Sequence, residues 1–222
     1  MHRDPEATLS YCIVDDRPVF LDLRRDRYFL LPSTGEALFG QILAGDVRPD
    51  DARARALART LDLPADWAAV RRGALDRGDA VPVESDLADV PADETSWWAV
   101  CRAIVAQRSA ERQLRRNPLL ETIDLRRRRK RDGAAPGTEN ERDERRVVLA
   151  FRTSRLIRSS AQKCLAASIA MIDELARVGS FPDLVFGVAL APFAAHCWVQ
   201  RGAVVLNDRA EHVRAYTPIL VI

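Results

Sequence analysis

The sequence has no long hydrophobic run and no large excess of charge of either sign. No segment approaches the roughly 20 apolar residues that span a bilayer, and no apolar signal segment follows the opening residues. The 34 basic residues nearly balance the 32 acidic ones, which leaves a formal net charge of +2. We therefore expect a cytoplasmic protein that binds neither nucleic acid nor membranes.

Paired cysteines and a phosphate-binding loop are also missing. None of the four cysteines has the C-x-x-C spacing typical of a structural zinc site, and a reducing cytoplasm argues against disulfides. No G-x-x-x-x-G-K motif is present, so nucleotide chemistry is not expected. We predict no metal and no other cofactor. Each cysteine has to be judged on its own surroundings: Cys12, Cys101, Cys164 and Cys197.

Short apolar runs alternate with polar turns in the first third of the chain. Residues 11–14, 19–23 and 28–31 predict three antiparallel strands. Ser33 begins an S-x-x-E capping box, which predicts a helix that starts there and ends at Gly45.

Two further helices and a linker are expected beyond this unit. Ala, Arg and Leu dominate residues 50–61 and 65–77, which favours helix. The prolines and acidic residues that follow carry no regular pattern and indicate a linker. We therefore predict an α+β protein with a small winged-helix-like domain of three strands and three helices at residues 1–80, a linker at 81–94 and a second domain at 95–222.

The second domain begins with helical segments and ends with strands. Apolar residues at helical spacing predict a helix at 95–116 whose buried face includes Trp97, Trp98 and Cys101. The Arg-rich stretch 126–131 and the polar segment that follows are interpreted as a solvated, exposed surface. Contact between this stretch and an acidic partner is the alternative.

Cys164 is the cysteine best placed for chemistry. A helix is expected at 145–158, and residues 165–178 again carry apolar side chains at helical spacing. If a serine caps this second helix, Cys164 lies in its first turns, where unpaired amides and the helix dipole favour the thiolate. Lys163 adds positive charge nearby. The alternative is that Cys164 only packs, which is the commoner role of a cysteine on an apolar helical face.

His196 and Asp208 follow on apolar segments that predict antiparallel strands. A carboxylate at Asp208, at the end of a strand, can orient the imidazole of His196, whose other nitrogen can then act as the general base for Cys164. Asn207 is the competing third member of this triad. His212 lies in a polar turn and is expected to contact solvent.

The motifs around these residues resemble the leader peptidases of lasso peptide biosynthesis, which are transglutaminase-like cysteine peptidases. The matching segments are Lys163-Cys164-Leu165, Gly187-Val188, Phe193-Ala194-Ala195-His196-Cys197-Trp198-Val199 and Asn207-Asp208. The resemblance implies a C-terminal transglutaminase/papain-like α+β domain with Cys164, His196 and Asp208 as its catalytic triad. Backbone amides near Cys164, together with Gln162, are expected to hold the oxyanion. Cys197 departs from the family, which commonly has Ala there, but it should face away from His196.

The N-terminal strands and first helix resemble the PqqD-like precursor-recognition fold. The resemblance rests on Val19-Phe20-Leu21-Asp22-Leu23, Arg27-Tyr28-Phe29-Leu30-Leu31 and Thr34-Gly35-Glu36-Ala37-Leu38-Phe39. In that family the leader segment adds as an extra strand on the sheet edge, which implies leader contacts at Tyr28, Phe29, Leu30 and Leu31. The implied partners are the precursor peptide and an ATP-dependent, asparagine-synthetase-like macrolactam cyclase.

Two other functions are compatible with the same sequence. A transglutaminase-like site also permits acyl transfer, in which an amine replaces water in the second half of the reaction. A non-catalytic chain would instead be a scaffold that presents the precursor to the cyclase. The product distinguishes hydrolysis from transfer, and replacement of Cys164 distinguishes both from the scaffold.

Overall fold

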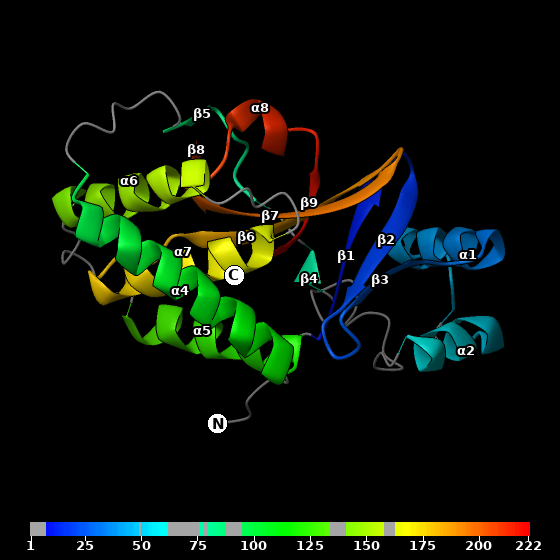
Figure 1. The fold of residues 1–222 in the computed structure, drawn as a ribbon. Helices are drawn as coiled ribbons and strands as arrows, with labels where there is room; N and C mark the ends of the chain where they lie inside the picture. The colour runs from blue at the N-terminus through cyan, green and yellow to red at the C-terminus, as the bar shows by residue number, and fades with distance from the viewer. Residues whose placement is uncertain are drawn as a thin grey trace.

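The computed structural model describes residues 8–48, 50–61, 76–77, 80–87, 95–133, 141–157 and 163–222. Over these residues the chain has the predicted α+β fold, with one β-sheet in the N-terminal part and a second, helix-covered sheet in the C-terminal part (Figure 1). Among the described helices, none combines the length and the hydrophobicity that a bilayer crossing requires.

The N-terminal sheet is an antiparallel meander with one short parallel strand added. Its strand order is β3-β2-β1-β4, so β3 is an edge strand. Asp15 and Asp16 have positive φ angles of 49° and 61°, which suits the tight turn between the first two strands. The strands are β1 (Leu9–Val14), β2 (Arg17–Asp22), β3 (Arg27–Leu30) and β4 (Asp76–Arg77).

Two described helices, α1 (Ser33–Ala44) and α2 (Ala52–Thr60), accompany this sheet. The predicted end of α1 at Gly45 is confirmed, because Gly45 adopts the left-handed conformation at φ 88°. The predicted capping box is wrong: Pro32 is the N-cap residue without a side-chain cap, and Glu36 instead pairs with Arg17 at 2.9 Å.

The third predicted helix, at 65–77, falls largely outside the described residues. Its last two positions form β4, which pairs with β1, so the helix prediction is wrong there.

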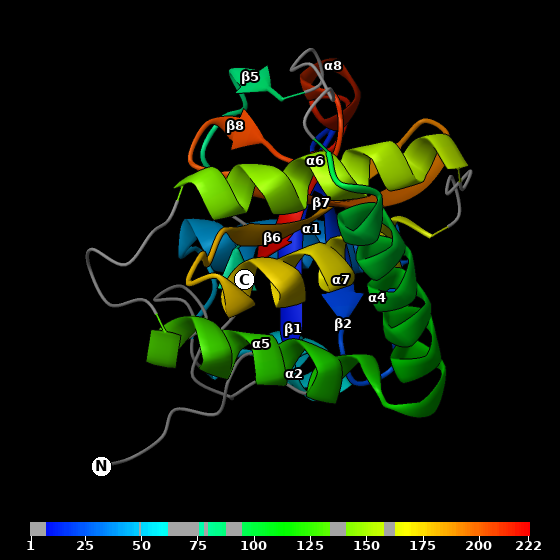
Figure 2. The same ribbon diagram turned by 60° about the vertical axis from the view of Figure 1, so that its left-hand side comes forward.

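The C-terminal sheet has the order β5-β8-β7-β6-β9. Helix α7 packs on this sheet, and α4, α5 and α6 surround α7 on its outer side (Figures 1 and 2). The strands are β5 (Ser85–Asp86), β6 (Asp183–Leu190), β7 (Phe193–Arg201), β8 (Val204–Val205) and β9 (Thr217–Val221). The helices are α4 (Trp97–Arg116), α5 (Leu119–Gly133), α6 (Glu141–Ile157), α7 (Cys164–Arg177) and the short α8 (Ala210–Val213).

A continuous core joins the two sheets. Val19 and Leu21 of β2 are buried in the same cluster as Ile169 of α7 and Val199 of β7. Phe20, on the opposite face of β2, is buried in a smaller cluster with the residues of α1 and α2. Strands β1 and β2 are therefore covered on both faces, and the edge strand β3 has a fixed position relative to the C-terminal sheet.

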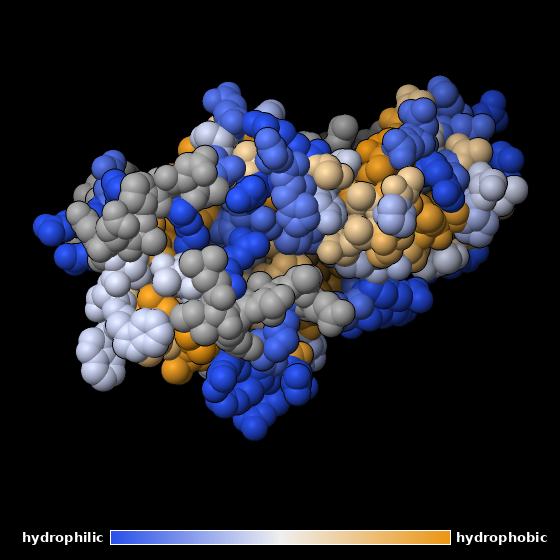
Figure 3. Space-filling model, turned by 45° about the horizontal axis from the view of Figure 1, so that its top comes forward, coloured by the Kyte–Doolittle hydropathy of each residue, from blue (hydrophilic) through white to orange (hydrophobic). Residues whose placement is uncertain are grey.

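The surface of the molecule is mixed in character. In Figure 3, hydrophilic residues gather near the middle of the molecule, with an apolar area to their right.

The segment predicted as a linker contributes to the second sheet. Ser85 and Asp86 form β5, which pairs in parallel with β8, and the Asp86 carboxylate accepts from the backbone N–H of Ala210 at 2.6 Å. Residues 88–94 lie outside the described part of the chain.

The predicted burial of the tryptophans is wrong. Trp97 is 65% exposed and Trp98 is 83% exposed. Helix α4 instead buries Val100, Ala103, Gln107 and Ala110, mostly small side chains, and it packs closely on α7 and α6. Hydrophobicity alone therefore does not identify the buried face of this helix.

The Arg-rich stretch is not a purely solvated surface. Arg126 is only 4% exposed and pairs with Asp173 of α7 at 2.5 Å, and Lys130 pairs with Asp183 at the start of β6. The expected exposed segment also ends earlier than predicted, because α6 begins at Glu141. Glu141, Asp143 and Glu144 lie in the first turn of α6, where acidic side chains stabilise a helix.

Candidate active site

Cys164 is the first residue of α7, the helix that lies against the sheet. Lys163 is the N-cap residue, and Cys164 is partly buried. The backbone amides of Cys197 and Leu165 both act on the Cys164 thiol and lower its pKa, and the amide of Leu165 has no partner within the helix at this position. One turn later, the buried Ser168 donates to the carbonyl of Cys197 at 3.0 Å and ties the helix to β7. The thiol therefore lies at a fixed junction between helix and sheet.

His196 lies on β7, directly opposite Gly187 of β6. A Cβ atom at Gly187 would lie 2.6 Å from the Trp198 ring and 2.9 Å from the Cβ of Tyr216, so any larger residue would displace them. The imidazole lies with its centroid 6.1 Å from that of Trp198 and 5.1 Å from that of Tyr216. These neighbours fix the plane of the His196 ring.

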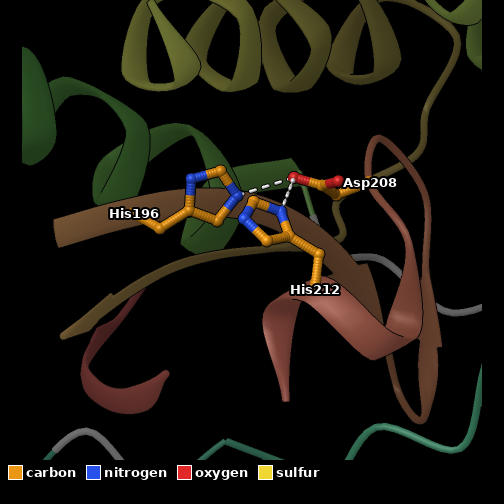
Figure 4. A group of neighbouring side chains, drawn as sticks. All are labelled: His196, Asp208 and His212. Carbon is orange, nitrogen blue, oxygen red and sulfur yellow. Dashed lines mark hydrogen bonds and ion pairs between the residues drawn. The ribbon is translucent and has the colours of Figure 1, made fainter. Parts of the chain in front are cut away.

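Asp208 lies in the turn between β8 and α8 and contacts His196. The distance between His196 Nε2 and Asp208 Oδ2 is 2.6 Å, and the two side chains are 11% and 8% exposed (Figure 4). The other carboxylate oxygen, Oδ1, accepts from the backbone N–H of Arg209 at 2.8 Å and lies 3.7 Å from Arg155. Asp208 was predicted to lie at the end of a strand, but β8 ends at Val205, so a turn orients this carboxylate.

Asn207, the alternative third member, has a different set of contacts. Its Oδ1 accepts from the backbone N–H of Val199 at 2.8 Å, and its Nδ2 donates to Ser168 Oγ at 2.8 Å. These two bonds hold the turn against β7 and α7. Asp208, and not Asn207, therefore provides the carbonyl or carboxylate oxygen beside the imidazole.

The electrostatics of the three residues are mutually dependent. Burial alone would raise the pKa of Cys164, but His196 and the backbone amides of Cys197 and Leu165 outweigh it, so the pKa is lowered. Burial alone would lower the pKa of His196, but Asp208 and Cys164 outweigh it and raise the pKa to about 9. These opposite shifts favour a thiolate beside an imidazolium, which is the reactive form of a nucleophilic cysteine.

The carboxylate that supports this pair stays ionised. Burial alone would raise the pKa of Asp208, but the hydrogen bonds of His196 and Arg209 and the charge of Arg155 hold it well below its usual value. A charged Asp208 stabilises the positive form of His196. Because Nε2 is engaged by Asp208, Nδ1 is the ring nitrogen left for the sulfur.

His212 is a second histidine beside Asp208, a contact that its place in a polar turn did not predict. Its Nδ1 lies 3.2 Å from the same Asp208 oxygen, and its ring centroid is 4.7 Å from that of His196 (Figure 4). The predicted solvent contact is confirmed, because the side chain is 51% exposed. The contacts with Asp208 and His196 were not predicted. The available signal was the separation of only four residues from Asp208, which permits contact where the chain turns back after the aspartate.

A cleft of about 630 Å³ opens onto the sulfur. Its walls come from α4, α6, α7, β7 and the turn before α8, and they include Gln107, Arg152 and Arg155. Cys197 is fully buried, and burial raises the pKa of its thiol well above the usual value, so it is no competing nucleophile. Gln162, the predicted oxyanion residue, lies outside the described residues.

The four predicted leader contacts divide between two faces of the molecule. Tyr28 lies toward the C-terminal sheet, with its ring 5.8 Å from that of Phe193, whereas Phe29 stacks on Phe20 at 5.1 Å. Leu30 is 37% exposed. Leu31 is buried in the small core, so its side chain stabilises the sheet and helices and is not open to a peptide.

The chain matches one protein-family model. That model describes the transglutaminase-like superfamily and covers residues 103–221, just over half of the chain. The matched region contains the cysteine, histidine and aspartate described above. No curated protein and no solved structure gives a significant match.

Proposed function

This chain belongs to the transglutaminase-like superfamily, and from that premise we propose that it is a cysteine peptidase that removes the leader from a ribosomally made lasso peptide precursor. The observation that carries the proposal is the position of His196, whose Nε2 lies 2.6 Å from Asp208 Oδ2 and whose ring shares a cleft with Cys164, the residue with which it is electrostatically coupled. Nucleophile, base and orienting carboxylate are thus connected in one cleft. This is the geometry that thiol acyl chemistry requires.

The first half of the proposed reaction forms a thioester. The Cys164 thiolate attacks the carbonyl carbon of the scissile bond, and the C–N bond then breaks while His196 gives a proton to the leaving amine. Asp208 holds the imidazole and stabilises its positive form. Backbone amides at the start of α7, together with Gln162, are proposed to stabilise the oxyanion.

The second half releases the leader. His196, now neutral, takes a proton from a water molecule that attacks the thioester carbonyl. The thiolate leaves, and the leader departs with a free carboxylate. Cys164 and His196 return to their starting protonation states.

The edge strand β3 supports the proposed leader-binding role. Among the described residues it pairs with β2 and with no other strand, so its other edge offers backbone groups to an added strand. All four residues of β3 are partly buried or exposed, and three of them, Tyr28, Phe29 and Leu30, are proposed leader contacts. The shared core holds this edge in a fixed position relative to Cys164, which suits a peptide bound at one end and cut at the other.

The proposed setting is cytoplasmic. The freed core peptide would pass to an ATP-dependent, asparagine-synthetase-like macrolactam cyclase. In this proposal ATP is used by the cyclase and the peptidase acts without a cofactor.

Acyl transfer is the second candidate, because the superfamily includes this chemistry as well as hydrolysis. In that case an amine would attack the thioester in place of water. The product would carry an amide where hydrolysis leaves a carboxylate. Mass spectrometry distinguishes the two products directly.

The test is incubation of the precursor peptide with the purified chain, with and without the cyclase and ATP, followed by mass spectrometry. We expect cleavage between leader and core by the unaltered chain and by Cys101→Ala, which removes a cysteine outside the cleft. Cys164→Ala should bind the leader but not cleave it. Cleavage that survives Cys164→Ala would rule out the proposal, and precursor left intact by every variant would support a scaffold instead.

A further inference from the structure

Asp208 is shared by two histidines in an asymmetric way. Its Oδ1 is occupied by the Arg209 amide and faces Arg155. Its Oδ2 faces only the two imidazoles among the contacts of the described residues, with His196 Nε2 at 2.6 Å and His212 Nδ1 at 3.2 Å. Two ring nitrogens and one carboxylate oxygen therefore converge on one point at the edge of the cleft (Figure 4).

We infer that His196, Asp208 and His212 form a binding site for a late first-row transition metal ion, of which Zn²⁺ is the expected one, and that metal binding there reversibly inhibits the enzyme. The three possible ligand atoms all lie within 4.8 Å of one another, so small rotations of the rings would bring them to a common ion. Two imidazoles and a carboxylate are a ligand set that Zn²⁺ uses in proteins, and the cleft leaves a further position open to water.

Access to this point comes from the exposed side. His212 is 51% exposed and lies on α8, a helix of four residues, so its ring can turn without disturbing the core. His196 and Asp208 are buried and preorganised. An ion would therefore meet two fixed ligands and one adaptable ligand.

Nearby cations oppose metal binding. Arg155 lies 3.7 Å from Asp208, and Arg152 lines the same cleft. The site should therefore bind Zn²⁺ more weakly than a closed structural zinc site does. Weak, reversible binding is what an inhibitory site requires.

The inhibitory effect follows from the tautomer of His196. A metal ion on Nε2 displaces the proton that the imidazolium carries there, so the one remaining ring proton sits on Nδ1, the nitrogen that faces Cys164. His196 can then no longer accept a proton from the thiol or from the attacking water. Metal binding also removes Asp208 as the partner that stabilises a positive imidazole. This part of the inference rests on the proposed function, whereas metal binding itself does not.

Calorimetry on the full chain tests the site without any activity measurement. Zn²⁺ is titrated into Cys164→Ala, which removes the thiol as a possible ligand, and into the same protein with His212→Ala added. We expect one ion per chain in the first case and an affinity at least about tenfold lower in the second, because even indirect supporting residues of metal sites contribute that much. His2→Ala, in the same Cys164→Ala background, removes a different histidine and should have no effect.

Two results would overturn the inference. Absence of zinc binding by Cys164→Ala would remove the site, and equal affinity with and without His212 would remove the third ligand. An activity arm then tests inhibition: Zn²⁺ should inhibit the unaltered chain and EDTA should restore it, while His212→Ala should resist zinc. If the chain cleaves no precursor at all, the proposed function fails, and the calorimetry still decides whether the metal site exists.

Discussion

Gly187 and His196 lie directly opposite each other on β6 and β7, and the absence of a side chain at Gly187 makes room for the residues around the imidazole. Trp198, two positions along β7, projects over the glycine, where a Cβ would meet its ring at 2.6 Å. Among the described residues, the His196 ring lies beside three other rings, those of Trp198, His212 and Tyr216. A single backbone position in β6 thus controls the orientation of the proposed base.

Gly187→Ala is expected to damage both stability and activity. The added methyl group cannot fit without movement of Trp198 or Tyr216, and overpacking of this kind costs about 1–3 kcal/mol of unfolding free energy. Because the displaced rings contact His196, precursor cleavage should fall by more than the loss of folded protein explains. Urea unfolding and cleavage rates, measured on the same preparation, give the two effects separately.

Gly40→Ala is the matched control. Gly40 lies within α1, and a Cβ there would meet no atom within 4 Å. This change should leave cleavage unaltered and should not destabilise the protein, since Ala is favoured over Gly inside helices by about 0.5–1 kcal/mol. Equal effects from the two glycine variants would contradict the role assigned to Gly187.

Asp208→Asn and Asn207→Ala should separate chemistry from structure. Asp208→Asn keeps the shape of the side chain but removes the charge that stabilises the positive His196, so turnover should fall by about 10²–10⁴-fold, far more than the loss of folded protein explains. Asn207→Ala removes bonds to Val199 and Ser168, so it should lower the melting temperature first. A large loss of turnover from Asn207→Ala at unchanged stability would instead make Asn207 the orienting residue.

Activity should depend on pH through the Cys164 and His196 pair. The lowered pKa of Cys164 allows the thiolate to form at lower pH than in a free cysteine, and the raised pKa of His196 keeps the imidazolium until the pH rises through about 9. In metal-free buffer, kcat/KM should therefore fall on an alkaline limb near pH 9. Asp208→Asn should move this limb to lower pH, because Asp208 is one cause of the raised pKa. An alkaline limb that stays in place would show that Asp208 does not support His196.

The patterns that succeeded are local ones. The helix that starts at Cys164 and the strand that carries His196 follow from apolar spacing over a few residues, and these segments also carry the motifs that point to the transglutaminase-like superfamily. Gly45 ends α1 because a left-handed residue is needed at that position. The roles of the site residues, by contrast, remain predictions until the variants are tested.

The expectations that failed depended on contacts between distant segments. Trp97 and Trp98 are exposed because α4 uses smaller residues to approach α7. Glu36 pairs with Arg17 of β2 and does not cap its own helix. None of these partners can be identified from periodicity or composition.

Arg126→Ala should destabilise the protein strongly, although it lies in a stretch that the sequence assigns to the surface. Arg126 is 4% exposed, pairs with Asp173 at 2.5 Å and donates to the carbonyl of Thr122 at 2.7 Å. Removing one member of such a buried pair typically costs about 3–5 kcal/mol, because the remaining partner loses its compensation. Asp173 is 24% exposed and also pairs with Arg129, so we expect the lower end of that range.

Arg129→Ala is the control. Its side chain is 50% exposed, so the loss of unfolding free energy in urea should stay below about 1 kcal/mol. Similar, small losses from both variants would mean that the Arg-rich stretch is solvated after all, and a large loss from Arg126→Ala alone would establish that this stretch anchors α5 to the helix that carries Cys164.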